Sequence, residues 1–377
     1  MKFDYLIVGA GYSGAVIAER IASQLNKKVL IVEKRNHIAG NAYDYYDENG
    51  ILVHKYGPHI FHTKMKKVWD YLSRFTDWRY YEHRVLGLIE GKEVPIPFNF
   101  NSLYSLFPTK QAERLETELL ERYGFGTKVP ILKLRQSGSE RLNELAEYIY
   151  KYIFLNYNLK QWGLRPEELD PSVSGRVPVY LSRDNRYFQD NWQAIPKHGY
   201  TAMFENILAH PNIKVLLKTD YKDIIEDIKF DKLIFTGPID EYFGYSEGKL
   251  PYRSLRFELK NVSMPDPYSL LQKTAQLNSP NSNDYTRTTE FRHLTGQKAL
   301  FSTIAYEYSQ PYIIGENDPY YPIPKDENQQ LFDKYKSMAE SLDSVIFAGR
   351  LANYKYYNMD ETTGVALQTF EKKIALK

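Results

Sequence analysis

Residues 3–25 have the sequence FDYLIVGAGYSGAVIAERIASQL, an apolar run that three glycines interrupt before a helix-like pattern begins. The run at residues 3–8 is apolar and rich in β-branched side chains, which favours a strand buried on both faces. Gly9, Gly11 and Gly14 then supply a tight turn, a backbone that can approach a pyrophosphate, and close packing of the next helix. Free N–H groups at the start of that helix attract phosphates. The stretch therefore favours a dinucleotide-binding turn.

A second apolar segment supports this interpretation. Residues 27–35, KKVLIVEKR, form a strand-like run that reaches Glu33, at the distance where a carboxylate receives ribose hydroxyls in such folds. A GxGxxG motif alone is also compatible with a glycine-rich turn that binds no nucleotide. Glu33 by itself does not separate FAD from NAD.

Composition narrows the classes of function. The 377 residues carry 49 basic and 47 acidic side chains, and a net charge of +2 gives no long-range attraction to nucleic acid or to an anionic membrane. The absence of cysteine excludes disulfides, thiolate metal ligands and cysteine nucleophiles. No apolar run approaches the length of a transmembrane helix. We expect a cytoplasmic protein with no nucleic-acid partner and no membrane insertion.

The periodicity of apolar residues predicts an α/β protein built from three units. The predicted units are a discontinuous dinucleotide-binding domain of Rossmann-like fold (1–80, 205–245 and 340–377), a helical insertion domain (102–165), and an antiparallel-sheet domain for the substrate (81–101, 166–204 and 246–339). Residues 163–188 combine proline, glycine and charged residues with little periodicity. Long loops of this kind are usually functional, so we expect this segment to be a mobile lid.

Several stretches together resemble one family. They are GAGYSG, EKRNHIAGNAYD, YGPHIFHT, NYNLKQWG, VSGRVPV, FTGPIDEYF, DYTRTTE and GRLANYKYYNMD. In this order along nearly the full length, they resemble the bacterial UDP-galactopyranose mutases, which are flavoenzymes. The resemblance implies that the glycine turn binds FAD and that the first domain is FAD-binding.

The resemblance also implies an unusual activity. Members of the family are isomerases that interconvert UDP-galactopyranose and UDP-galactofuranose without net redox change, and so supply galactofuranose for cell-surface polysaccharide. The reduced FAD is the active form, because its N5 attacks the anomeric carbon of the sugar. A cellular reductant such as NAD(P)H and a homodimeric assembly are further implications.

The site residues follow from the same resemblance. Loss of UDP develops charge on a diphosphate, which fixed cations and hydrogen-bond donors stabilise. The residues implied as catalytic are Arg176, Arg287 and His62. Those implied to bind substrate are Asn99, Phe154, Tyr157, Trp162, Arg176, Tyr187, Asn278, Arg287, Tyr321 and Tyr356. Those implied to bind the cofactor are Gly9, Gly11, Ser13, Gly14, Glu33, Lys34, Asn41, His59, Ile60, Arg350, Asn358 and Met359.

Two positions depart from the family pattern. Ala39-Gly40 stands where two glycines are usual, and Asn358 stands where an aspartate is usual, so local cofactor contacts differ there. His59 and His62 suggest a metal or a general base, but no carboxylate or third ligand follows at metal spacing, and we expect no metal site. In the family this histidine loop lies over the flavin.

Two other functions remain open from the residues. An FAD-dependent oxidoreductase of the amine-oxidase type shares the nucleotide-binding start, although it gives no reason for the arginines and tyrosines implied at the diphosphate. A binding module that keeps the flavoprotein fold without catalysis is the second alternative. Whether the substrate carries an N-acetyl group at C2 also stays open.

Overall fold

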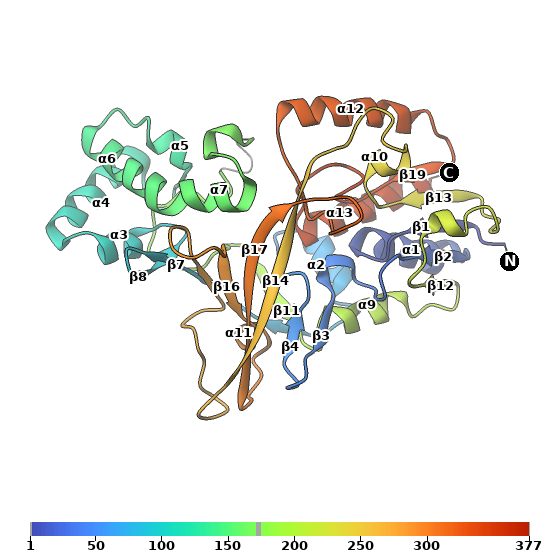
Figure 1. Ribbon diagram of the computed structural model, residues 1–377, viewed down its shortest axis with the longest axis horizontal. Coiled ribbons are helices and arrows are strands. Elements are labelled where there is room, and N and C mark those ends of the chain that lie inside the picture. The colour runs from blue at the N-terminus through green and yellow to red at the C-terminus, as the bar shows by residue number, and fades with distance from the viewer. Residues whose placement is uncertain (1, 171–174, 377) are drawn as a thin grey trace.

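We describe the protein from a computed structural model that covers residues 2–170 and 175–376. The dinucleotide-binding part of the fold contains a five-stranded parallel sheet in the order β12-β2-β1-β13-β19, with β1 at the centre (Figure 1). The strands are β1 (Tyr5–Val8), β2 (Val29–Val32), β12 (Ile213–Leu216), β13 (Lys232–Phe235) and β19 (Val345–Phe347). This is the parallel sheet that the opening glycine motif predicted for a dinucleotide-binding domain.

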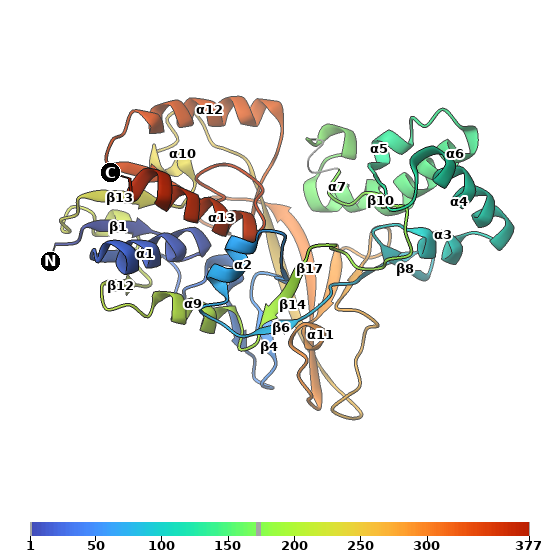
Figure 2. The same ribbon diagram turned by 180° about the vertical axis from the view of Figure 1, so that it is seen from behind.

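Three helices cover one face of this sheet. They are α1 (Tyr12–Leu25), α9 (Tyr200–Leu208) and α13 (Met359–Thr369), and α1 contacts the other two (Figure 2). Ile17 and Phe204 are fully buried in the core that these helices form with Ile7 and Ile31 of the sheet. Because β2 is buried on every residue, it has no polar face, as a central parallel strand requires.

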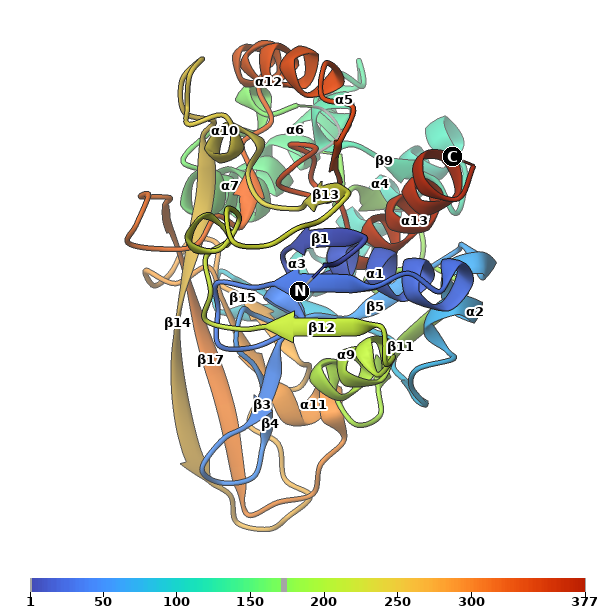
Figure 3. The ribbon, with the colours of Figure 1, turned by 90° about the vertical axis from the view of Figure 1, so that its right-hand side faces the viewer.

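A second sheet has seven strands in the order β18-β14-β17-β16-β15-β7-β8. The strands are β7 (Val85–Ile89), β8 (Lys92–Ile96), β14 (Tyr252–Ser263), β15 (Gln276–Asn278), β16 (Arg287–Glu290), β17 (Phe301–Pro311) and β18 (Tyr321–Pro322). All pairs are antiparallel except β15 with β7. The long strands β14 and β17 run past the edge of the nucleotide-binding sheet (Figure 3).

The helical insertion has its own hydrophobic core. Its elements are α3 (Phe100–Leu106), α4 (Thr109–Tyr123), β9 (Lys128–Val129), α5 (Ile131–Leu134), α6 (Glu140–Ile149), a π-helix (Tyr150–Leu155) and α7 (Asn156–Trp162). Two features were not expected. The π-helix joins α6 to α7 without a break, and β9 pairs with β10 (Val179–Tyr180), which ties the end of the predicted lid to the insertion.

The smaller elements correct one predicted boundary. Residues 192–204 were assigned to the substrate sheet domain, but β11 (Trp192–Pro196) pairs with β5 (Phe61–Thr63) and β6 (Trp78–Tyr80), and α9, which begins at Tyr200, packs on α1. This segment therefore belongs with the first 80 residues, because its apolar face is buried there. The other boundaries stay predictions.

The remaining elements connect these layers. The strands and helices among them are β3 (Asp44–Tyr46), β4 (Leu52–His54), α2 (Lys66–Leu72), α10 (Ile239–Tyr242), α11 (Phe291–Thr295), α12 (Asp326–Glu340) and a terminal π-helix (Phe370–Ile374). Short 3-10 turns lie at Gly40–Ala42, Pro166–Glu168 and Tyr221–Asp223. In the described part of the chain, none of the helices is both long and apolar enough to cross a membrane.

Candidate functional site

A cavity of about 560 Å³ lies between the two sheets. Its walls come from the carboxyl ends of β1, β2 and β13 on one side and from β7, β15 and β16 on the other. Ligands of doubly wound sheets bind outside the carboxyl ends of the strands, so the fold places this cavity where a dinucleotide is expected.

The glycine turn forms one end of the cavity. Gly9 has a φ of 102°, and a Cβ there would lie 2.2 Å from Thr236 Oγ1. A Cβ on Gly14 would lie 2.0 Å from the carbonyl oxygen of Gly9. The first turn of α1 contains no acidic residue, and its N-cap residue Gly11 has no side chain to bond the free N–H groups. These groups remain available to an anion.

Glu33 closes the same end of the cavity. Its Oε2 accepts a hydrogen bond from Ala10 N at 3.0 Å, and its Oε1 accepts one from Arg35 N at 2.9 Å. The carboxylate therefore joins the end of β2 to the glycine turn, and its remaining lone pairs face the cavity that Glu33 lines. A glycine turn, an uncapped helix start and a carboxylate at the end of the second strand fit a bound dinucleotide.

Arg287 enters the cavity from β16. Its Nε donates to Glu307 Oε2 at 2.8 Å, and Glu307 lies directly opposite on β17. Burial by itself lowers the pKa of Arg287, but the charge of Glu307 outweighs it and holds this pKa well above its usual value. The guanidinium is therefore a fixed cation, with Nη groups that Glu307 does not bind in the described contacts.

Arg176 lines the same cavity as Arg287. Its Nη1 donates to the carbonyl oxygen of Tyr356 at 3.2 Å, and its Nη2 donates to Asn358 Oδ1 at 2.6 Å. The guanidinium also lies over the Tyr356 ring, 4.2 Å from the centroid. Asn358, which replaces the usual aspartate, thus binds Arg176 without neutralising it.

Most of the predicted site residues lie together. Those that line the cavity are Gly9, Gly11, Ser13, Glu33, Lys34, Asn41, His59, Ile60, His62, Arg176, Tyr187, Asn278, Arg287, Tyr321, Arg350, Tyr356, Asn358 and Met359. Burial raises the pKa of Tyr187 and of Tyr321, so both phenols keep the proton that they can donate. The cavity therefore combines cations with neutral hydrogen-bond donors.

Four predicted residues lie behind the wall of the cavity. Gly14 packs against Gly9, and Phe154 belongs to the core of the helical insertion. Trp162 contacts Tyr321 and Tyr356, with ring centroids 5.9 and 5.8 Å apart. Burial raises the pKa of Tyr157, and the charge of Arg287 acts in the opposite direction, which places this phenol near that guanidinium.

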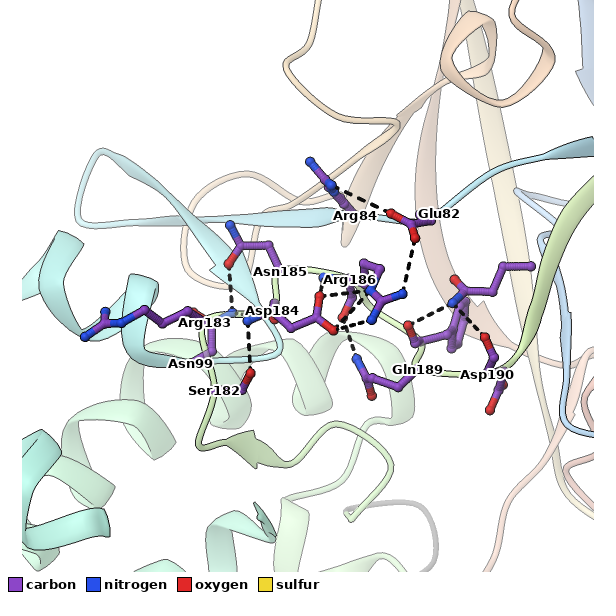
Figure 4. Close-up of polar contacts among 12 residues, drawn as sticks. Glu82, Arg84, Asn99, Ser182, Arg183, Asp184, Asn185, Arg186, Gln189 and Asp190 are labelled. Atoms are coloured by element: carbon purple, nitrogen blue, oxygen red, sulfur yellow. Dashed lines mark hydrogen bonds and ion pairs between the residues drawn. The ribbon is translucent and has the colours of Figure 1, made fainter. Parts of the chain in front are cut away.

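Asn99 has a structural role in place of the predicted substrate contact. Its Oδ1 accepts hydrogen bonds from Asn101 N and Ser102 N at the start of α3, and only 1% of the residue is exposed. Its Nδ2 donates to the carbonyl oxygen of Asp184 and to Asn185 Oδ1 (Figure 4). All its side-chain atoms are engaged within the protein.

Part of the predicted lid is held in place. Residues 171–174 of the expected lid, 163–188, lie outside the described residues. Arg186 donates to both oxygens of Asp184 and to Glu82 (Figure 4). Tyr187 N donates to the carbonyl oxygen of His83 at 2.7 Å. Together with the bonds of Asn99 and the pairing of β10 with β9, these contacts anchor the segment from Val179 onward, so among its described residues we expect movement only before Val179.

The two histidines of the loop have different partners. Burial lowers the pKa of His59 to about 3, and its Nδ1 donates to the carbonyl oxygen of Gly57 at 2.8 Å. His62 Nδ1 lies 2.5 Å from Asp190 Oδ2, and the ring stacks on Phe188. The hydrogen bond from His62 lowers the pKa of Asp190. His62 is thus oriented by a carboxylate that the sequence did not reveal.

Several cavity residues were missed from the sequence. They are His83, Val85, Phe188, Thr236 and Gln276. A signal was present for Gln276, because it lies two residues before Asn278 on one strand and so shares its face. Among the described residues, no cluster of three or more histidines or carboxylates could hold a metal ion.

Comparison with known proteins decides the family. A family model described as UDP-galactopyranose mutase matches residues 152–356, and a model of an NAD(P)-binding Rossmann-like domain matches residues 7–75. This chain belongs to the UDP-galactopyranose mutase family. The resemblance of the sequence motifs is thereby confirmed.

Relatives in the family have more than one substrate in their names. A probable UDP-galactopyranose mutase of Klebsiella pneumoniae is 34% identical, over 98% of this chain and 94% of its own length. The UDP-galactopyranose mutase of Mycoplasma pneumoniae is also 34% identical, over 98% and 96%. A dTDP-fucopyranose mutase of Escherichia coli has the same 34% identity, over 94% of each chain. Identity alone does not separate these substrates.

Solved structures share the fold of this family member. A crystal structure of reduced UDP-galactopyranose mutase aligns with a TM-score of 0.71, at 18% identity, over 100% of this chain and 95% of that chain. A putrescine oxidase aligns with a TM-score of 0.57, at 12% identity, over 100% and 99%. The fold is therefore shared by solved proteins whose names carry different activities.

Proposed function

We propose that this member of the family is an FAD-dependent isomerase that interconverts UDP-galactopyranose and UDP-galactofuranose. One observation carries the proposal: Arg176 and Arg287 face the same cavity that the glycine turn lines. A diphosphate between two guanidinium groups can leave and return next to the cofactor. An amine-oxidase-type reaction would give these cations no role, and a non-catalytic module would not need them.

Arginine and tyrosine side chains of the chain would bind the diphosphate, and the cofactor would supply the nucleophile. Arg287, oriented by Glu307, and Arg176 stabilise charge on the diphosphate as the bond to the sugar breaks. Tyr187 and Tyr321 line the cavity as protonated donors to the same group. Reduced FAD, when bound, supplies N5 as the nucleophile for the anomeric carbon.

His62 is proposed to hold a proton away from the reacting centre. If Nδ1 carries the proton toward Asp190, then Nε2 keeps a free lone pair on the cavity side. A lone pair there can accept a hydrogen bond from the cofactor or the sugar. Asp190 would then act as a positioning residue for the histidine.

A second candidate substrate is the dTDP-fucose pair. The dTDP-fucopyranose mutase of Escherichia coli is as similar as the named UDP-galactopyranose mutases. Both substrates carry the diphosphate that the arginines would bind, so the arginines do not discriminate between them. NAD(P)H as the cellular reductant and a homodimer remain part of the proposal.

The test is turnover of the furanose by the reduced holoenzyme. Purified protein with bound FAD is reduced with dithionite and incubated separately with UDP-galactofuranose and with dTDP-fucofuranose, and the pyranose is measured by chromatography. We expect UDP-galactopyranose from the reduced protein and almost none from the oxidised protein. Equal turnover with and without reductant would exclude the nucleophilic role of the flavin. Protein that purifies without yellow colour and does not take up FAD would favour the binding module.

A further inference from the structure

Two buried amide atoms face the cavity without a partner. They are Nε2 of Gln276 and Oδ1 of Asn278, and among the described residues neither has a hydrogen-bond partner. Both residues line the cavity. They lie two positions apart on β15, so their side chains share one face of the strand. An unpaired buried donor and acceptor are costly in a folded protein, which indicates that a ligand completes them.

A chain of hydrogen bonds fixes the orientation of Gln276. Burial lowers the pKa of His83 to about 4, so the imidazole is neutral near pH 7 and carries one N–H. His83 Nε2 lies 2.5 Å from Gln276 Oε1, and His83 Nδ1 lies 3.3 Å from the hydroxyl of Tyr81. With the Tyr81 hydroxyl donating to Nδ1, the proton sits on Nε2 and binds the amide oxygen. The NH2 group of Gln276 is left to face the cavity.

The position of Gln276 relative to Arg287 indicates which part of the ligand it meets. Asn278 lies opposite Arg287 in the β15–β16 pair, and Gln276 lies opposite Thr289, one repeat farther along the strand. Side chains two residues apart on a strand are separated by roughly 6.5 Å, about the width of a hexose ring. A diphosphate bound at Arg287 therefore brings a group attached to it within reach of Gln276.

The other end of the diphosphate has a different neighbour. The resemblance to the mutase family assigns Tyr157 to the base end of the substrate site, and this residue lies behind the cavity wall on α7, which packs against β17. Gln276 lies instead beside Val85 of β7, next to cavity residues that include His62 and His83. α7 reaches the chain just beyond β15, where Lys160 donates to the carbonyl oxygen of Ser279 at 2.8 Å. Gln276 therefore lies on the side of Asn278 away from α7, and we infer that this is the sugar side.

Resting on the proposed function, we propose that Gln276 is a specificity-determining residue that donates from Nε2 to a ring hydroxyl of the substrate hexose. Asn278 Oδ1 accepts from a neighbouring hydroxyl, and His83 acts as the positioning residue that turns the Gln276 amide toward the sugar. A site of this kind discriminates against a sugar that lacks the hydroxyl, because the buried NH2 group is then left unpaired.

The test compares the binding of a nucleotide diphosphate with that of its sugar. Oxidised holoenzyme is titrated by calorimetry with UDP and with UDP-galactose, for the wild type and for Gln276→Leu. We expect Gln276→Leu to weaken UDP-galactose binding about 10-fold to 100-fold and to leave UDP binding unchanged, since loss of one buried neutral hydrogen bond has this effect. His83→Phe should weaken UDP-galactose binding less, because the amide remains but is free to turn.

Controls separate recognition from damage to the sheet. Gln272→Leu changes a glutamine just before the same strand whose side chain is absent from the cavity wall, and should leave both affinities unchanged. A set of UDP-galactose analogues, each lacking one ring hydroxyl, identifies the hydroxyl that Gln276 binds. For one analogue, the wild type should bind more weakly than it binds UDP-galactose. Gln276→Leu should bind that analogue and UDP-galactose with equal affinity. The same pair of titrations with dTDP and dTDP-fucose covers the second candidate substrate.

Three outcomes would overturn the inference. If Gln276→Leu lost affinity for UDP and for UDP-galactose equally, the amide would belong to the nucleotide site. If the variant lost affinity for FAD, the amide would belong to the cofactor site. If its affinity for both sugar nucleotides were unchanged, the amide would not bind the substrate. Failure of the proposed function would look different, because the wild type would bind the sugar nucleotide but the reduced enzyme would not convert the furanose.

Discussion

Gly14 and Gly11 lie three residues apart, but they meet different neighbours. A Cβ on Gly14 would lie 2.0 Å from the carbonyl oxygen of Gly9, whereas a Cβ on Gly11 would have only ordinary contact with Gly40, at 3.7 Å. We expect Gly14→Ala to destabilise the protein by about 1–3 kcal/mol, as overpacking does. Gly11→Ala should fold normally but bind FAD more weakly, because its methyl group occupies space next to the expected pyrophosphate.

The two glycine variants are compared by thermal unfolding of the protein without FAD and by FAD titration. Equal loss of stability in both would show that the methyl group of Gly11→Ala also disturbs the turn. A normal unfolding temperature for Gly14→Ala would contradict the close approach of the helix to Gly9.

Arg287 combines an ion pair with an expected diphosphate contact. In Arg287→Lys a single ammonium replaces the planar fork, so it cannot hold Glu307 and the diphosphate in the same geometry. We expect Arg287→Lys and Arg287→Ala each to lower turnover of UDP-galactofuranose by the reduced enzyme about 100-fold or more. Arg256→Lys, on the exposed part of β14 beside Glu258, is the matched control and should keep full turnover. Unchanged turnover in Arg287→Ala would remove Arg287 from the mechanism.

At the scale of elements, Asn99 joins helix α3 to the segment that begins at Ser182. Asn99→Ala removes the N-cap of α3, so we expect the free energy of unfolding to fall by about 1 kcal/mol. Asn99→Asp keeps the cap oxygen but sets a buried carboxylate oxygen against the two oxygens that the amide donates to, on Asp184 and Asn185, and should lose more stability than Asn99→Ala. Both variants should retain the KM of the wild type, measured in the turnover assay. A raised KM with unchanged stability would restore the predicted substrate contact.

The strand β4 carries a buried histidine that affects stability in acid. Burial lowers the pKa of His54 from its ordinary 6.5 to about 3. Between these values the unfolded chain binds a proton that the folded state does not, so stability falls as the pH drops below 6.5. From pH 7 to pH 5 this histidine should account for a loss of about 2 kcal/mol.

The histidine effect is measured by denaturant unfolding at pH 7 and pH 5. His54→Gln should lose about 2 kcal/mol less than the wild type over this range, whatever its stability at pH 7. His198→Gln, at an exposed position, is the control and should follow the wild type. The same loss in His54→Gln as in the wild type would mean that His54 is protonated in the folded protein.

At the scale of the whole molecule, we propose that the described residues of the lid around Arg176, 175–178, open to admit the substrate and close on its diphosphate. Arg176 makes its described contacts with Tyr356 and Asn358, and it lines the same cavity as Arg287. A ligand shifts such an equilibrium only by binding one state better, and UDP should bind better when Arg176 is in place.

Limited trypsin digestion of the holoenzyme tests this motion. We expect UDP to slow cleavage after Arg176 several-fold and to leave cleavage after Arg183 unchanged, because Arg183 is already held by Glu116. Cleavage sites are identified by mass spectrometry at early times. Protection at Arg183 equal to that at Arg176 would indicate general shielding in place of closure, and no protection at Arg176 would contradict the lid.

The local pattern of the sequence was enough for the nucleotide-binding half of the fold. Residues 3–25 form β1 and α1 as predicted. In the second sheet, the turn at Glu90-Gly91 likewise closes the hairpin of β7 and β8, with both residues at positive φ. Such elements depend on neighbours in the chain, so periodicity and glycine spacing reveal them. The predicted site residues were found differently, through the order of motifs that resembles the mutase family.

Tertiary structure alone decided what several side chains do. His62 meets Asp190, 128 residues away, and His83 meets Gln276, 193 residues away. Asn99 looked like a ligand residue, but its amide is used by α3 and by the chain near Asp184. Local sequence determines which strands and turns can form, whereas the partner of a buried polar group depends on which distant strand packs beside it, and no periodicity in the sequence encodes that choice.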